Sequence, residues 1–189
     1  MPLEFHHDTL IVDASCLINL YASNQLANIL QAIPKTVTVA AYVANREALF
    51  IQGEVNESGE RTKEQIVLQP FIDAGLLHIV DLAEEDETET FATFSALIVD
   101  RGEAVTGAIA LHRNWAIIVD DKKARRLFQQ HASRLQLVYT LELVKHWVDC
   151  EAPVAAMITT TLQNIRKRAI YTPHRQHPLY EWWHRYNGG

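Results

Sequence analysis

Five short apolar runs, several of them rich in β-branched residues, recur along the chain with helix-like stretches between them. The runs are TLIVD at 9–13, TVTVA at 36–40, LLHIVDL at 76–82, WAIIVDD at 115–121 and LQLVYT at 135–140. Continuous apolar runs of this length are typical of strands buried on both faces, and helical connections are typical of parallel strands. The sequence therefore predicts an α/β fold with three layers, α/β/α, around a mostly parallel sheet.

The segments between the runs carry helical signals. Apolar residues at 26, 29, 30 and 33 share one helical face, and Ser15 is a suitable N-cap for the apolar stretch after it. Further helices are predicted over 41–50, 84–100, 102–114, 122–132, 141–148 and 153–168. The polar stretch 52–64 is predicted as a loop or insertion, followed by a helix to about Ala74. Residues 169–189 are aromatic and basic, with little periodicity.

The chain has 189 residues and a net charge of −6, unevenly distributed. Residues 1–150 hold 21 acids and 12 bases, whereas residues 151–189 hold 2 acids and 5 bases. We expect one domain over 1–150 and a C-terminal helical extension over 151–189. An acidic body with a basic tail suits a protein that gathers carboxylates around a metal ion and binds a polyanion. A solvated acidic surface is the plainer alternative.

Signals for export or membrane insertion are missing from the sequence. No apolar run reaches the roughly 18 residues that a bilayer span requires, and the N-terminus lacks a basic segment followed by a long apolar one. Two cysteines do not make a disulfide framework. The sequence therefore predicts a cytoplasmic protein.

Acids follow two of the predicted strands. Asp13 ends the first, and Asp120 with Asp121 end the fourth. Ligand sites of open α/β sheets lie at the carboxyl ends of the strands, so these acids converge if the strands are neighbours. Glu103, at the start of the preceding helix, and Glu47, in the helix after the second strand, are two further candidates.

Carboxylates gathered in one pocket raise one another's pKa unless a cation compensates their charge. Mg²⁺ or Mn²⁺, bound through oxygen ligands, is the natural cation, and it supports water activation at a phosphate. Each acid also has a structural alternative. Asp13 could cap a turn, Asp120 or Asp121 could cap the next helix, Glu103 could complement a helix dipole, and Glu47 could be an exposed helix residue.

Two segments carry a family resemblance. LIVDASCLINLYA and GEAVTGAIALHRNWAIIVDDKKARRLF resemble the PIN domain, and in particular its subgroup with a GEA motif and a strand that ends in Asp-Asp. The resemblance covers about residues 9–140. It implies a PIN-like fold and a ribonuclease that depends on Mg²⁺ or Mn²⁺. Many members are toxins of type II toxin–antitoxin pairs and many form dimers, so an RNA substrate, an antitoxin protein and a homodimer are implied partners.

The resemblance also assigns roles. The implied catalytic acids are Asp13, Glu47, Glu103 and Asp121, and the implied metal ligands are Asp13, Glu103, Asp120 and Asp121. Ser15 completes the Asp-x-Ser pattern beside Asp13. Ser15 is also a nucleic-acid-binding candidate. The other candidates are four basic residues beside the Asp-Asp pair, which could equally form an exposed helix face: Lys122, Lys123, Arg125 and Arg126.

One position departs from the subgroup. A second acid commonly follows the GEA glutamate by two residues, and here that position is Val105. This departure supports an alternative in which the chain is a PIN-like binding or assembly module with weak or no catalysis. A phosphatase of the haloacid dehalogenase type is a poorer match, because its nucleophile motif requires an acid where Ser15 stands. The histidines at 174 and 177 lack the fuller ligand set of a zinc site.

Overall fold

A five-stranded parallel sheet forms the centre of the computed structural model, which describes residues 2–56, 58–97 and 100–188. The strand order is β5-β2-β1-β6-β7. Every neighbouring pair is parallel. The five strands of the sheet are β1 (Thr9–Val12), β2 (Thr36–Ala40), β5 (His78–Val80), β6 (Ala116–Ile118) and β7 (Leu137–Val138). All five fall within the predicted runs, so the predicted α/β sheet is confirmed.

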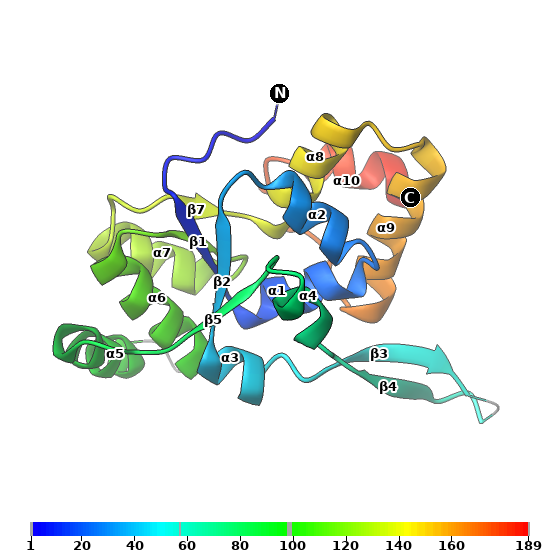
Figure 1. The fold of residues 1–189 in the computed structure, drawn as a ribbon. Helices are drawn as coiled ribbons and strands as arrows, with labels where there is room; N and C mark the ends of the chain where they lie inside the picture. Colours follow the sequence, from blue (N-terminus) through cyan, green and yellow to red (C-terminus); the bar gives the residue numbers. More distant parts are fainter. Residues whose placement is uncertain (1, 57, 98–99, 189) are drawn as a thin grey trace.

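Helices cover both faces of this sheet (Figure 1). Helices α5 (Glu85–Leu97), α6 (Arg101–Arg113) and α7 (Lys122–His131) lie on one face. On the other lie α1 (Ala14–Ala22), α2 (Leu26–Ala32), α8 (Thr140–Glu151) and α9 (Ala155–Arg168). The arrangement is the predicted three-layer α/β/α fold with added C-terminal helices. The predicted helix over 84–100 is present as α5, and residues 98 and 99 lie outside the described part.

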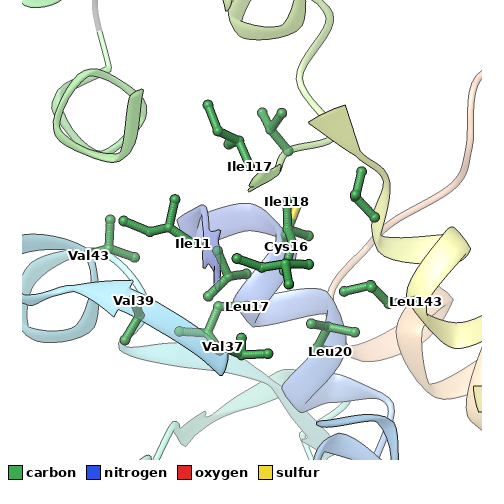
Figure 2. Packing of buried hydrophobic residues seen from close by; sticks show 14 of the residues in the cluster. Ile11, Cys16, Leu17, Leu20, Val37, Val39, Val43, Ile117, Ile118 and Leu143 are labelled. Atoms are coloured by element: carbon green, nitrogen blue, oxygen red, sulfur yellow. The ribbon is translucent and has the colours of Figure 1, made fainter. Parts of the chain in front are cut away.

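Apolar side chains from both faces close the core. Leu10, Ile11 and Val12 of β1 are at most 1% exposed although they alternate in direction, because the central strand is covered on both sides. Figure 2 shows side chains of β1, β2 and β6 packed around Cys16, Leu17 and Leu20 of α1. Cys16 is fully buried and belongs to this core.

A glycine permits close packing of α6 against α7. A methyl group added at Gly107 would lie 2.2 Å from an atom of the Phe128 ring. The ring is fully buried, so it has little room to move. The second glycine of the GEAVTG segment therefore serves packing.

The predicted loop at 52–64 is instead an antiparallel hairpin of β3 (Phe50–Val55) and β4 (Arg61–Gln65), which projects from the body in Figure 1. The helix predicted to follow this stretch and run to about Ala74 is shorter than expected, since α4 spans only Gln69–Asp73. All five residues of β4 are exposed. Within β3 only Ile51 is buried, so the hairpin lacks the apolar alternation that would reveal it.

The C-terminal segment is more ordered than its sequence indicates, because it contains α10 (Tyr180–Asn187). Trp183 is 1% exposed and packs edge-on against the Tyr171 ring, with the two ring centres 5.7 Å apart. The tail therefore packs on the body through aromatic side chains. In the described part of the chain, no helix is both long and apolar enough to cross a membrane.

A buried ion pair joins α5 to α6. Arg113 Nε donates to Glu87 Oε1 at 2.6 Å, and the Glu87 side chain is 1% exposed. The Arg113 hydrogen bond is the main reason that the pKa of Glu87 falls to about 2. A carboxyl whose pKa is lowered by folding stabilises the folded state above its unfolded pKa, and this stabilisation is lost as the pH falls towards 2.

We expect Glu87→Gln to lower the free energy of unfolding by about 1–3 kcal/mol at pH 7, because Arg113 loses its charged partner. Urea unfolding from pH 7 to pH 2 measures this, and the difference from the wild type should shrink below about pH 4.5. Glu89→Gln, which makes the same change on an exposed position of α5, is the control. Equal losses in the two variants would contradict the assignment.

Candidate active site

The candidate site lies where the chain reverses its direction of travel across the sheet, between β1 and β6. From β1 the chain proceeds to β2 on one side and later to β6 on the other. A crevice at the carboxyl ends of the strands is expected at such a switch point. The Asp13 N–H donates to the Ile118 carbonyl at 3.0 Å, so the pairing continues past the end of β1. Asp13 and the Asp120–Asp121 pair therefore share one edge.

Asp13 is 3% exposed and is oriented by Ser15. Its Oδ2 accepts hydrogen bonds from the Ser15 hydroxyl at 2.8 Å and from the Ser15 N–H at 3.3 Å. Asp13 is thus the N-cap of α1, and the prediction of Ser15 as the N-cap is wrong by two residues. Oδ1 is buried without a hydrogen-bond partner within the described part. Burial raises the pKa of Asp13 to about 6.

Glu103 lies in the first turn of α6, near several other acids. Burial is the largest cause that raises its pKa to about 8, and the charges of four carboxylates add to the rise: Asp13, Asp121, Asp100 and Glu47. We call these five acids the carboxylate cluster. Four of them are predicted from the sequence: Glu103 itself and three of the acids whose charges raise its pKa, Asp13, Asp121 and Glu47.

Asp100 is the member that the sequence analysis missed. It is the N-cap of α6, where its side chain accepts a hydrogen bond from the Glu103 N–H at 3.0 Å. An Asp followed by Glu three residues later is a known signal for a helix start, and it would have placed this acid beside Glu103.

Glu47 reaches the cluster through a close contact with Gly102. It follows α3 (Ala41–Arg46) as its C-cap, so the helix predicted over 41–50 ends before it. The Gly102 N–H donates to Glu47 Oε1 at 3.1 Å, and a methyl group at Gly102 would lie 1.8 Å from Oε2. Only glycine allows this approach. Oε2 is buried without a partner within the described part, and burial, Asp100 and Asp13 raise the pKa of Glu47 to about 7.

The two neighbouring acids after β6 have different surroundings. Asp121 caps α7, and its Oδ1 accepts from the N–H groups of Lys123 at 2.7 Å and Ala124 at 2.9 Å. Asp120 instead binds across the fold, because Oδ2 accepts from Asn19 at 3.1 Å and Oδ1 accepts from the Thr140 N–H at 2.9 Å. Each Asp120 oxygen therefore already has a protein donor, whereas the charge of Asp121 acts on Glu103.

The cluster fits a divalent cation by its chemistry. Its donors are carboxylate oxygens, which Mg²⁺ and Mn²⁺ prefer, and two of these oxygens are buried without partners. Burial is the largest cause of the raised pKa values of Asp13, Glu47 and Glu103, and neighbouring carboxylates add to the rise. Among the residues described, however, no three histidine, cysteine, aspartate or glutamate side chains are grouped so that they could hold a metal ion. The side chains would therefore have to approach one another around an ion.

The four basic candidates on α7 divide into two groups. Lys122, Lys123 and Arg126 are exposed and line a shallow pocket on the helix. Arg125 points inward, where its guanidinium donates to the Val119 and Leu137 carbonyls at 2.8 and 3.2 Å and lies 3.4 Å above the centre of the Tyr139 ring. Arg125 is therefore engaged in the fold. Ser15 is exposed beside Asp13, as expected of a residue that faces the site.

In the absence of metal, the cluster should make stability depend on pH. An acid whose pKa is raised by folding destabilises the folded state as the pH rises from its unfolded to its folded pKa. The loss should therefore develop between about pH 4 and pH 8. We expect Glu103→Gln to raise the free energy of unfolding at pH 8 by about 1–3 kcal/mol in EDTA and to weaken this pH dependence.

Urea unfolding in EDTA at several pH values measures the effect, with Glu60→Gln in the exposed hairpin as the control. If Glu103→Gln followed the wild-type curve at every pH, the repulsion inferred from the geometry would be absent.

Comparisons with known proteins now bear on this site. No protein with a curated description matches the chain. A solved structure, VapBC2 from Rickettsia felis bound to a DNA fragment from their promoter, is similar at 14% identity with a TM-score of 0.39, over 69% of this chain and 98% of that one. A family model described as a PIN domain matches residues 9–176, which is most of the sequence. The chain therefore belongs to the PIN domain family.

Proposed function

We propose that the protein is a metal-dependent ribonuclease whose active site is the carboxylate cluster. The observation that carries the proposal is the gathering of acids at the switch point of the sheet, where Asp13 Oδ1 and Glu47 Oε2 are buried without hydrogen-bond partners among the described residues. Such a concentration of charge destabilises a fold unless a ligand compensates it. Membership of the PIN domain family supports the same activity.

The chain's own residues would prepare the site in distinct ways. Ser15 holds one oxygen of Asp13 and leaves the other available, and the Gly102 N–H does the same for Glu47. Asp121 accepts the two cap hydrogen bonds of α7 through one oxygen, Oδ1, while its charge raises the pKa of Glu103. A bound divalent cation would supply an activated water and stabilise negative charge on the phosphate. Asp120 is better suited to positioning, because both of its oxygens accept hydrogen bonds from the protein.

Asp100 offers an explanation for the departure at Val105. Val105 is 3% exposed and packs in the core, so this position of α6 faces away from solvent. The negative charge of Asp100, at the N-terminus of the same helix, contributes to the raised pKa values of Asp13, Glu47 and Glu103. We infer that Asp100 supplies the further negative charge that related chains place two residues after the GEA glutamate.

The exposed bases of α7 are the proposed contacts for the RNA backbone. Lys122 and Lys123 directly follow Asp121 and are exposed, so phosphates bound there would lie beside the cluster. Arg126 extends the same surface. The antitoxin protein and the homodimer implied by the sequence resemblance stay predictions.

Cleavage of a mixed RNA pool tests the proposal. The purified protein should cleave with Mn²⁺ or Mg²⁺ and not with EDTA. Asp13→Asn should reduce the rate by roughly a thousandfold or more, because it removes a charge from the ion site without changing the side-chain shape. Its thermal stability in EDTA should equal or exceed that of the wild type, since repulsion falls.

Asp8→Asn is the matched control. Asp8 lies before β1, at the opposite edge of the sheet, where it pairs with Lys35 at 2.7 Å, and its side chain is 98% exposed. Full activity is expected of this variant. A well-folded Asp13→Asn protein that cleaves as fast as the wild type would exclude the proposed site. Metal binding without cleavage of any RNA would favour the alternative, a binding module.

Gly102→Ala should separate stability from activity. Alanine favours a helix over glycine by about 1 kcal/mol, and the displaced group is the flexible end of Glu47, so the protein should remain folded. The displaced carboxylate should lower kcat by about 100-fold. A melting curve with an RNA cleavage assay checks both parts. Wild-type activity in this variant would remove Glu47 from the catalytic residues.

A further inference from the structure

A second polar cluster lies at the same edge of the sheet and is built by the C-terminal tail. We call His174 and His177 the tail histidine pair. Their ring centres are 5.8 Å apart, and the Tyr139 ring lies 4.3 Å from that of His177. The Arg125 guanidinium covers Tyr139. Four segments thus meet around the pair: β7, α7, the residues between β7 and α8, and the tail.

The hydrogen bonding of His177 fixes where its proton lies. The Leu179 N–H donates to Nδ1 at 2.9 Å, so Nδ1 carries a lone pair and the neutral ring bears its hydrogen on Nε2. The ring is 4% exposed, and Nε2 has no hydrogen-bond partner within the described part of the chain. His177 therefore presents a buried N–H donor without an acceptor, an arrangement that costs free energy unless a ligand or water fills it.

His174 adds a second unfilled position. Both of its ring nitrogens are buried without partners among the described residues, and one of them must carry a hydrogen in either tautomer. The backbone joins the two rings in one turn, because the His177 N–H donates to the His174 carbonyl at 2.8 Å. Two imidazole donors are thus held side by side by the backbone.

The charges around the pair select an anion. After burial, the positive charges of Lys122 and Arg125 are the main causes that lower the pKa of His174, while Asp120 acts in the opposite direction. Burial is also the largest cause that lowers the pKa of His177, to about 4, and the charges of His174 and Arg125 add to the fall. A metal cation would be repelled by these neighbours, and it would find a hydrogen on His177 Nε2 where it needs a lone pair. An oxygen anion would accept that hydrogen.

The position of the pair relates it to the proposed active site. Tyr139 follows β7, and the next residue, Thr140, donates its N–H to Asp120. Arg125 binds the Val119 and Leu137 carbonyls at the ends of β6 and β7. Both anchors belong to the carboxyl edge that carries the carboxylate cluster. Lys122, whose positive charge lowers the pKa of His174, directly follows Asp121 in the chain.

We propose that the tail histidine pair and Lys122 form a phosphate subsite, which binds a backbone phosphate of the RNA next to the one that is cleaved. This inference rests on the proposed function, from which it takes the identity of the polyanion. The tail, which lies outside the carboxylate cluster, would then contribute to substrate binding. Backbone binding of this kind is independent of base sequence.

Imidazole ¹⁵N NMR of the whole protein in EDTA tests the subsite, because no cleavage is needed. Inorganic phosphate and then a six-nucleotide RNA are the probes. Both should shift the ring signals of His174 and His177 in a saturable way. His177→Phe retains the ring volume, and it should weaken RNA binding by roughly tenfold, since it removes a hydrogen bond to a charged group.

His6→Ala, an exposed histidine before β1, should bind RNA as the wild type does. If His177→Phe does not fold, His174→Phe at the less buried ring carries the comparison. Ring signals that respond to Zn²⁺ but not to phosphate would overturn the proposal, as would signals that respond to neither probe because water fills the site. A response to phosphate without a response to RNA would also overturn it. A protein that shows no cleavage but binds RNA through the pair would refute the nuclease alone.

Discussion

The parallel pairing of β1 with β6 is the contact on which the candidate site depends. It places Asp13 and the Asp120–Asp121 pair at one edge, and α6, which packs on this pair of strands, adds Glu103 and Asp100. The resulting charge repulsion is unfavourable by itself. It is tolerated because the same strands are buried on both faces, so that the apolar core holds the acids together.

Sequence patterns predicted those elements whose burial produces periodicity. The five strands of the sheet and the helices that cover it each have an apolar face or are apolar throughout, and all were found. The hairpin of β3 and β4 and helix α10 were not. The hairpin is held by polar anchors, since Arg168 of α9 binds both Glu64 oxygens at 2.7 and 2.8 Å and Arg61 donates to the Lys167 carbonyl. Contacts between residues about a hundred positions apart leave no local pattern.

The same distinction holds for the site. The acids at the strand ends could be predicted because the topology of a parallel sheet brings strand ends together. The close approach of Glu47 to Gly102 could not, because it depends on a single missing methyl group 55 positions away along the chain. Arg125 was expected to bind nucleic acid by its sequence position, yet its rotamer faces the carbonyls at the ends of two strands. Residue type and spacing do not determine whether a long side chain near the start of a helix extends into solvent or folds back onto the protein.

The order of the strands along the chain has a consequence during synthesis. The central strand β1 is synthesised before its second partner, β6, which follows more than a hundred residues later in the chain. Until then one edge of a short, mostly apolar strand is unpaired, and exposed edges of this kind associate with other chains. We expect nascent chains that stop before residue 116 to recruit chaperones strongly, and the acids of the site to meet only after β6 and the Asp120–Asp121 pair have left the exit tunnel.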